Sequence, residues 1–239
     1  MKRLIVIISL LFSLISYSQE NDSIKTKIET DLQFSIATRN LWRGIIFGNS
    51  PSLQTLLICR IKSLEIGLFG TLSTNGSRLG YPNTTEAYIS YYKDGFALSL
   101  SDYYFFNTED SLNDYFDYSK TTQHFLEARL KYSNDKIWIL GGYNVYSGSW
   151  VGNYSTFPYV EIGYTYENIS FFIGGVTNKS TLNFMEKGGI TNIGIKIEKP
   201  IILGSLSAYV VYNPNYRYIT DIREVGKNPI NLVGILTFK

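Results

Sequence analysis

The side chains that could do chemistry are few and lie far apart in this sequence of 239 residues. His124 is the single histidine and Cys59 the single cysteine, so the two cannot complete a zinc site. One acidic stretch lacks the spacing and the glycine of an EF-hand, and we interpret it as a solvated loop: Glu109, Asp110, Asp114 and Asp117. The sequence therefore predicts neither a metal site nor a cofactor.

His124 could act as a catalytic base only with a nucleophile beside it. The adjacent Phe125 and Leu126 supply none. Thr121, Thr122 or a distant serine could supply one. We expect no enzyme and interpret His124 as a histidine at a membrane interface, with a lipid-modifying enzyme left open as an alternative.

A second stretch combines an aromatic ring, a cation and a glycine in the order Trp42, Arg43, Gly44. An arginine beside a tryptophan can stack on the ring and offer its guanidinium to an anionic solute, which would constrict a channel mouth. In the alternative, Trp42 anchors at a membrane interface while Arg43 pairs with a loop carboxylate or a lipid phosphate. Both interpretations place the stretch at one end of a membrane-spanning structure.

The first 18 residues have the pattern of a secretory signal peptide. Two basic residues precede an apolar run that ends near residue 15, and small residues stand before a cleavage site at Gln19. The run is shorter than the roughly 20 apolar residues of an anchoring helix. We therefore expect export, with residues 1–18 removed and residues 19–29 forming a flexible periplasmic lead.

The charge balance changes once the signal peptide is removed. Loss of Lys2 and Arg3 lowers the basic count from 22 to 20, against 20 acids, so the mature chain is formally neutral. No basic stripe interleaves with aromatic residues, and we expect no nucleic-acid partner. The lone Cys59 cannot form an internal disulfide, so an exported chain of this kind needs another source of stability.

After the lead, apolar and polar residues alternate with a period of two, in stretches bounded by turn residues. The clearest contrast lies in 121–132, where aliphatic residues alternate with Glu127, Arg129 and Lys131. Twelve strands are predicted in all: Thr30–Thr38, Ser52–Ile61, Leu64–Ser73, Thr85–Lys93, Phe96–Phe106, Thr121–Tyr132, Lys136–Tyr146, Tyr154–Tyr166, Ile169–Thr177, Gly189–Glu198, Ser205–Asn213 and Pro229–Phe238.

The predicted connections alternate between short and long along the chain. Short ones such as Asp94-Gly95 have the chemistry of tight hairpins, whereas long ones such as Asn107–Lys120 do not. An even strand number with every long connection at one end is typical of outer-membrane barrels. We therefore predict an all-β fold over residues 30–239: a single twelve-stranded antiparallel transmembrane β-barrel with short periplasmic turns and long extracellular loops.

Charged residues that oppose the apolar set of their strand are predicted to face the lumen, because a midplane Arg or Lys on the lipid face costs about 2–4 kcal/mol. The predicted pore-lining residues are Glu65, Glu86, Glu127, Arg129, Lys131, Glu161 and Lys196. Aromatic residues near strand ends, Tyr103 and Phe105 among them, are expected in interfacial girdles. The segment Tyr115–Tyr118 could grip a ligand or pack over the mouth.

The first long connection and the strand after it resemble the TorF-type porin family. That family's first hairpin carries a similar aromatic-Arg-Gly stretch followed by Pro, an apolar residue and Gln. The resemblance implies an outer-membrane barrel with a pore role and no agreed substrate or catalytic residues. Ile46 and Phe47 stand where relatives often have small polar residues, which puts an equivalent loop function in doubt. The matching positions are Trp42, Arg43, Gly44, Pro51 and Gln54.

Together these features predict an outer-membrane porin of a Gram-negative bacterium that passes small hydrophilic solutes by passive diffusion. Selectivity would come from the lumen charges, with constriction by Trp42 and Arg43. Twelve strands lie between about eight, which side chains fill, and the roughly 16–18 of open porins. A closed barrel acting structurally or adhesively through its long loops is therefore the alternative. Expected partners are outer-membrane lipid and lipopolysaccharide, small hydrophilic solutes and, through the C-terminal strand, the barrel-assembly machinery.

Overall fold

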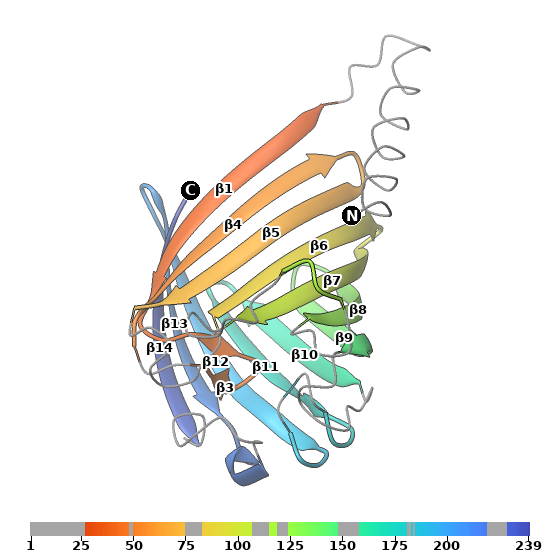
Figure 1. Ribbon diagram of the computed structural model, residues 1–239. Helices are drawn as coiled ribbons and strands as arrows, with labels where there is room; N and C mark the ends of the chain where they lie inside the picture. Colours follow the sequence, from red (N-terminus) through yellow and green to blue (C-terminus); the bar gives the residue numbers. More distant parts are fainter. Residues whose placement is uncertain are drawn as a thin grey trace.

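In the computed structural model the chain forms a closed barrel whose strands pair in sequence order (Figure 1). The structure describes residues 27–47, 50–74, 83–106, 115–118, 124–147, 158–180, 183, 185–218 and 229–239, so the predicted signal peptide and most of the lead lie outside it. All neighbouring barrel strands are antiparallel, and the first strand pairs with both the second and the last. The predicted twelve-stranded barrel is confirmed within these residues.

The barrel strands follow the predicted ranges closely. The largest difference at a turn is in the tenth barrel strand, which continues past Glu198 to Ile201 because the connection after it is the tight pair Ile202-Leu203. The strands are β1 (Ile28–Ala37), β4 (Ser52–Ile61), β5 (Leu64–Ser73), β6 (Asn83–Lys93), β7 (Phe96–Phe106), β8 (His124–Ser133), β9 (Ile137–Ser147), β10 (Tyr159–Tyr166), β11 (Ile169–Val176), β12 (Gly189–Ile201), β13 (Gly204–Tyr212) and β14 (Ile230–Phe238), with a 3-10 turn η3 at Tyr216–Tyr218.

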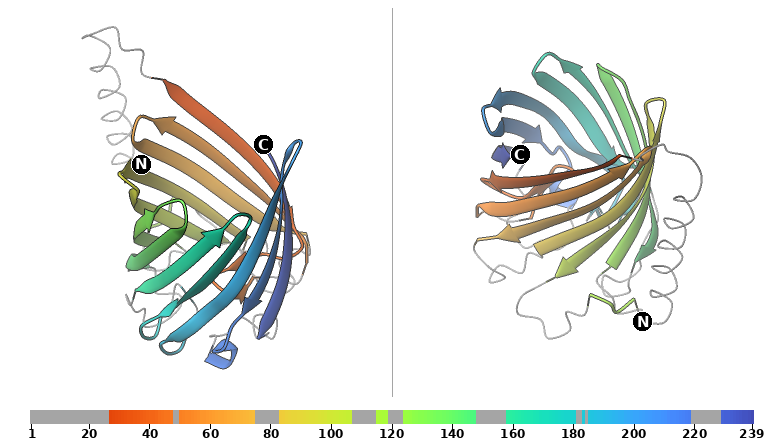
Figure 2. Two further views of the ribbon diagram at one scale, coloured as in Figure 1. Left: turned by 180° about the vertical axis from the view of Figure 1, so that it is seen from behind. Right: turned by 90° about the horizontal axis from the view of Figure 1, so that it is seen from above.

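One end of the barrel, called here the turn end, carries the tight connections. Asp94 and Gly95 both have positive φ, 51° and 83°, as a tight hairpin with a two-residue turn requires. At the next turn the Asn134 side chain accepts hydrogen bonds from the backbone nitrogens of Lys136 and Ile137. The turn end also holds the start of β1 and the C-terminus (Figures 1 and 2). The opposite end, called the loop end, carries the remaining connections.

The outer face of the barrel is apolar and the lumen face is polar. Leu32, Leu98 and Leu130 are 66 %, 59 % and 54 % exposed although each lies within a barrel strand. A soluble protein rarely leaves so large an apolar belt uncovered, whereas lipid covers it in a spanning barrel. The chain is therefore an outer-membrane β-barrel protein. Among the described residues no helix is long and apolar enough to cross a membrane.

Two short strands that the sequence did not predict lie inside the barrel. β2 (Leu41–Trp42) and β3 (Ile45–Ile46) pair with each other as a separate two-stranded sheet, and Ile45 and Ile46 are fully buried. They belong to the connection between β1 and β4, which turns into the lumen instead of away from it (Figures 1 and 2). We call residues 41–46 the lumen hairpin.

Candidate functional site

The lumen hairpin is held by a tight turn whose two central residues are Arg43 and Gly44. Their φ angles of 49° and 82° are those of the primed turns that fit two-residue hairpins. A Cβ at Gly44 would lie 2.1 Å from the backbone oxygen of Thr191 in β12. Glycine is therefore required here for both its backbone freedom and its size, because the tip of the hairpin touches the barrel wall.

The Arg43 side chain crosses the lumen and is the centre of the site. Its two terminal nitrogens donate to the two carboxylate oxygens of Glu127 on β8, at 2.8 and 2.7 Å. One nitrogen also donates to Asn183 at 2.9 Å. The guanidinium lies 4.5 Å from the ring centre of Trp42 and 4.2 Å from that of Tyr159. A bidentate pair stacked between two rings fixes the arginine in both plane and direction.

This pair is shielded from water, since the side chains of Arg43 and Glu127 are 7 % and 1 % exposed. Burial lowers the pKa of the Arg43 guanidinium, but the adjacent Glu127 carboxylate and its hydrogen bonds raise it by more than burial lowers it. The pKa is therefore raised overall, and the side chain stays charged. Gly142 on β9 leaves the space for the pair, because a Cβ there would lie 2.4 Å from a Glu127 carboxylate oxygen.

Alternating charges continue from Arg43 across the lumen toward β6. The Tyr103 hydroxyl donates to Glu127 at 3.3 Å and accepts from Arg129 at 3.0 Å. Arg129 in turn pairs with Glu86 at 2.8 Å. The hairpin is therefore the end of a continuous polar network, and each acid in it has a basic or hydroxyl partner.

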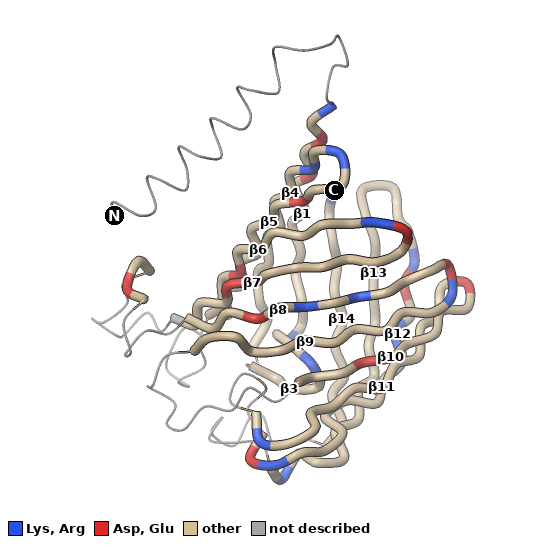
Figure 3. Tube along the Cα trace, turned by 90° about the vertical axis from the view of Figure 1, so that its right-hand side faces the viewer, with Lys and Arg blue, Asp and Glu red and all other residues tan. Residues whose placement is uncertain are grey.

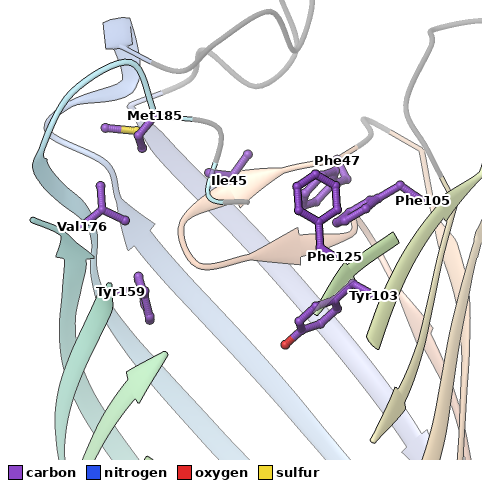
Figure 4. Packing of buried hydrophobic residues seen from close by; sticks show 8 residues of the cluster. All are labelled: Ile45, Phe47, Tyr103, Phe105, Phe125, Tyr159, Val176 and Met185. Atoms are coloured by element: carbon purple, nitrogen blue, oxygen red, sulfur yellow. The ribbon is translucent and has the colours of Figure 1, made fainter. Parts of the chain in front are cut away.

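On the loop side of Arg43 the lumen is filled by an apolar cluster (Figure 4). Residues from the hairpin, from β7, β8, β10 and β11, and from the connection after β11 meet there, and Trp42 packs against them with an edge-on contact to Tyr103 at 5.7 Å. The prediction that Tyr103 and Phe105 belong to an outer aromatic girdle is therefore wrong, because both face inward onto the hairpin. The cluster consists of Ile45, Phe47, Tyr103, Phe105, Phe125, Tyr159, Val176 and Met185.

On the turn side of the hairpin the lumen is hollow. A cavity of about 370 Å³ lies directly under the tip and is lined by Arg43, Glu161 and Lys196, among others. A second cavity of about 520 Å³, with Glu65, Arg129 and Lys131 in its lining, extends to the turn between β6 and β7. Beside the hairpin itself, next to Trp42, the space falls to about 40 Å³, room for a few water molecules.

The predicted pore-lining residues all lie on the lumen face, but most are already paired. Glu65 pairs with Arg60 at 2.6 Å and Glu161 accepts from Tyr159 at 2.6 Å. Lys196 pairs with Glu198. Lys131 is exposed within the larger cavity. The distribution leaves Lys131 as the charge most open to a solute.

The family-motif residues separate into two groups. Trp42, Arg43 and Gly44 form the hairpin, whereas Pro51 directly precedes β4 and Gln54 lies within it. The alternative interpretation is wrong for Trp42, which packs inside the lumen against Tyr103. Arg43 does pair with a carboxylate, but it is that of Glu127 on β8 and not one from a loop. Tyr159 and Asn183 were not predicted as site residues and had no signal in the sequence, because each contacts residues far away in the chain. The pair Gly141-Gly142 did indicate a strand bend or close packing, and at Gly142 the close neighbour is Glu127.

A second polar site lies on the outside of the barrel at the loop end. His124 and Asp102 sit on the lipid-facing sides of β8 and β7, and the segment Tyr115–Tyr118 covers them, so that His124 is 0 % exposed. The histidine lies 2.8 Å from Asp102 through Nδ1 and 2.7 Å from the Tyr115 backbone oxygen through Nε2. Tyr118 stacks on its ring at 4.1 Å and donates to Asp102 at 2.5 Å. We call this group the wall site.

The wall site corrects two predictions. His124 lies on the lipid-facing side near the loop end but is enclosed by protein. The segment Tyr115–Tyr118 packs on the outer wall and not over the mouth, and its gripping a ligand stays a prediction. Because Nε2 faces a backbone carbonyl, the ring is not directed at a nucleophile in this conformation. Thr121 and Thr122 lie outside the described residues, as do Glu109, Asp110 and Asp114. Within the described ranges, no three His, Cys, Asp or Glu side chains gather as metal ligands.

Comparisons with known proteins give only distant likenesses. No family matches the chain and no curated protein matches it. Among solved structures, outer membrane phospholipase A from Escherichia coli and the dimeric, calcium-bound outer membrane phospholipase from Salmonella typhi each superpose with a TM-score of 0.43 at 11% identity, over 92% of this chain and 93% of theirs. Values this low indicate nothing about the function of the chain. The barrel fold is shown by the strand pairing and the apolar outer face.

Proposed function

We propose that the chain is a channel for small hydrophilic solutes in the outer membrane of a Gram-negative bacterium, closed in this conformation by its own lumen hairpin. In the usual orientation of such barrels the turn end faces the periplasm and the loop end the outside. The channel has no catalytic role in this proposal, and solutes cross by diffusion. The resemblance of the hairpin stretch to TorF-type porins agrees with it.

One observation carries the proposal: cavities of about 370 and 520 Å³ with charged side chains in their lining end at a hairpin that, among the described residues, is joined to the wall by one ion pair, Arg43–Glu127. A barrel that served only as a scaffold would gain from filling its lumen on both sides of the hairpin. Here the turn side is left hollow and charged. Withdrawal of residues 41–46, together with opening of the apolar cluster above them, would connect those cavities to the loop end.

The test is single-channel conductance of residues 19–239 refolded into planar bilayers, in three versions. The wild-type chain is expected to show rare openings. The double variant Arg43→Gln/Glu127→Gln removes both charges without leaving one unpaired, and its openings should be about tenfold more frequent, because the charged bidentate pair is stronger than a neutral one. Replacing residues 40–47 by a short Gly-Ser linker in an E127Q background should give steady conductance.

Controls separate a closed gate from a misfolded barrel. Each version must show heat-modifiable migration on a gel before it is measured. In the linker version, Lys131→Glu should shift the reversal potential toward cation preference, because Lys131 is exposed in the larger cavity. Silence of a folded linker version would sink the channel proposal.

A second candidate is a closed surface barrel that acts through its loops. The apolar cluster over the hairpin favours it, because eight buried side chains form a packed core that resists withdrawal. In that case the double variant would stay silent and only its stability would change. The same recordings therefore distinguish the two candidates.

A further inference from the structure

Two connections of the loop end are joined by a backbone hydrogen bond. The Glu186 nitrogen, after β11, donates to the Tyr218 oxygen, after β13, at 2.8 Å. Each side of this joint is also braced: Ser180 and Met185 form a β-bridge, and the Tyr218 nitrogen donates to Asn215 at 2.9 Å. The surface is therefore held in shape by main-chain contacts.

The inner side of this surface is fixed to the lumen site. Ser180, Asn183 and Met185 are 1 %, 2 % and 0 % exposed, and Asn183 accepts from Arg43. Three charged residues of the same connection are exposed instead: Lys179, Glu186 and Lys187. The connection thus has one face packed into the barrel and one face turned away from it.

The outward face is basic and aromatic. Lys187 places its ammonium 3.5 Å from the ring centre of Tyr218, and Arg217 donates to the Tyr216 hydroxyl at 3.1 Å. A hydrogen bond from Lys187 and its charge lower the pKa of Tyr218. We call the exposed residues Lys179, Lys187, Arg217 and Tyr218 the basic patch; the ring of the adjacent Tyr216 packs against the apolar cluster. Glu186 is the one acid among the described residues of the two connections. Figure 3 shows the basic residues gathered beyond the loop end of β11.

The patch lies immediately beyond the apolar belt. β11 ends at Val176 and β13 at Tyr212, so Lys179 and Tyr216 follow within a few residues of the membrane-spanning part. The exposed Tyr212, at 45 %, marks the interface just below. This depth is where the headgroups of the outer leaflet lie. A surface meant for a soluble ligand would not need to begin at that level.

We propose that the basic patch binds the phosphorylated saccharide headgroup of an outer-leaflet lipid. Lysine and arginine supply charge-assisted hydrogen bonds to phosphate, and the exposed ring of Tyr218 adds a flat face for a sugar. The cation–ring contacts hold Lys187 and Arg217 in place, which lowers the entropy lost on binding. The inference rests on the orientation of the barrel in the outer membrane but not on its being a channel.

The test measures binding of lipid A, with and without its phosphate groups, to the full barrel in neutral detergent by native mass spectrometry. Wild-type barrel should prefer the phosphorylated lipid. Lys187→Gln/Arg217→Gln should weaken that binding by about thirtyfold, because each cation near an anionic lipid surface contributes about a fivefold change in affinity. The matched control is Lys136→Gln/Lys199→Gln at the turn end, which should bind as wild type does.

Three results would overturn the proposal. Equal binding of the dephosphorylated lipid would show that only the acyl chains are recognised. An equal loss in the turn-end control would show that net charge, and not the patch, attracts the lipid. Equally tight binding of a water-soluble sugar phosphate would assign the patch to a free ligand instead of a lipid. All three readouts are independent of conductance, so failure of the channel proposal leaves this test intact.

Discussion

Among the described residues, two buried polar contacts can be compared at the loop end: the ion pair Arg43–Glu127 inside the barrel and the hydrogen-bonded pair His124–Asp102 outside it. Inside, Arg43 and Glu127 are 84 positions apart in the sequence, and the pair also holds Asn183 from a third segment. Outside, His124 and Asp102 lie on adjacent strands, and the segment over them belongs to the connection between those strands. The inner pair therefore ties distant parts of the chain together, whereas the wall site ties a loop to its own hairpin.

The two sites differ in what their loss would expose. Releasing the lumen hairpin removes Ile45 and Trp42 from the apolar cluster and uncovers the side chains that pack against them. Releasing the segment Tyr115–Tyr118 uncovers two strands that stay paired on both sides. Four predictions test whether burial inside the barrel costs more to disturb than burial on its wall.

The largest effect is expected for Glu127→Gln, which leaves the Arg43 charge buried without its carboxylate. Breaking such a pair costs about 3–5 kcal/mol. The free energy of unfolding, measured by urea titration in phosphatidylcholine vesicles with tryptophan fluorescence, should fall accordingly. A decrease of less than about 1 kcal/mol in the free energy of unfolding would show that the hairpin leaves the lumen readily.

The next effect is steric and has a control in the adjacent residue. Gly142→Ala places a methyl group 2.4 Å from the Glu127 carboxylate, whereas the same change at Gly141 meets nothing nearer than 4.0 Å. Overpacking at Gly142 should cost about 1–3 kcal/mol in the same titration. Gly141→Ala should cost clearly less. Equal costs would mean that the methyl group does not reach the ion pair.

A smaller effect is expected at the wall site. His124→Asn removes the ring between Asp102 and the Tyr115 carbonyl and should cost about 1–2 kcal/mol, because the covering segment can move away while β7 and β8 stay paired. Asp102→Asn, which keeps an acceptor, should cost less than His124→Asn. If His124→Asn proves as damaging as Glu127→Gln, the distinction between the two sites fails.

The smallest effect is expected for the exposed pair Lys27–Glu29 at the turn end. The two side chains lie 2.7 Å apart but are 82 % and 52 % exposed. Water and salt screen such pairs, so Glu29→Gln should leave the unfolding midpoint unchanged within error. A measurable shift would mean that β1 depends on its first residues more than their exposure indicates.

The strands were predictable from the sequence because their signal is local. Alternation with a period of two places Glu65, Glu127 and Lys196 on one face whatever lies beyond the strand. Turn chemistry at Asp94-Gly95 fixes the register in the same way. The closed ring then follows from the even strand number and the need to pair both edges.

The course of the long connections was not predictable, because no period governs a loop. The apolar residues Leu41, Ile45 and Ile46 around Arg43-Gly44 were a hairpin signal, but Arg-Gly is not among the pairs that usually announce such a turn. Nothing in the spacing of Arg43 and Glu127 shows that they meet. Alternation along the strand also puts His124 on the lipid-facing side of β8, together with Leu126. It does not show that the segment Tyr115–Tyr118 covers the histidine, because that segment belongs to a loop.

The ring is closed by its shortest ladder. β1 and β14 are joined by four residue pairs, from Phe34↔Phe238 to Ala37↔Ile235, whereas β1 and β4 are joined by ten. These partners stand at opposite ends of the chain, so closure cannot begin until the whole polypeptide is available, and it carries the highest loop-closure entropy of any contact in the fold. A chain cut short before β14 would hold eleven strands with two open edges, and would join its neighbours edge to edge instead of closing on itself.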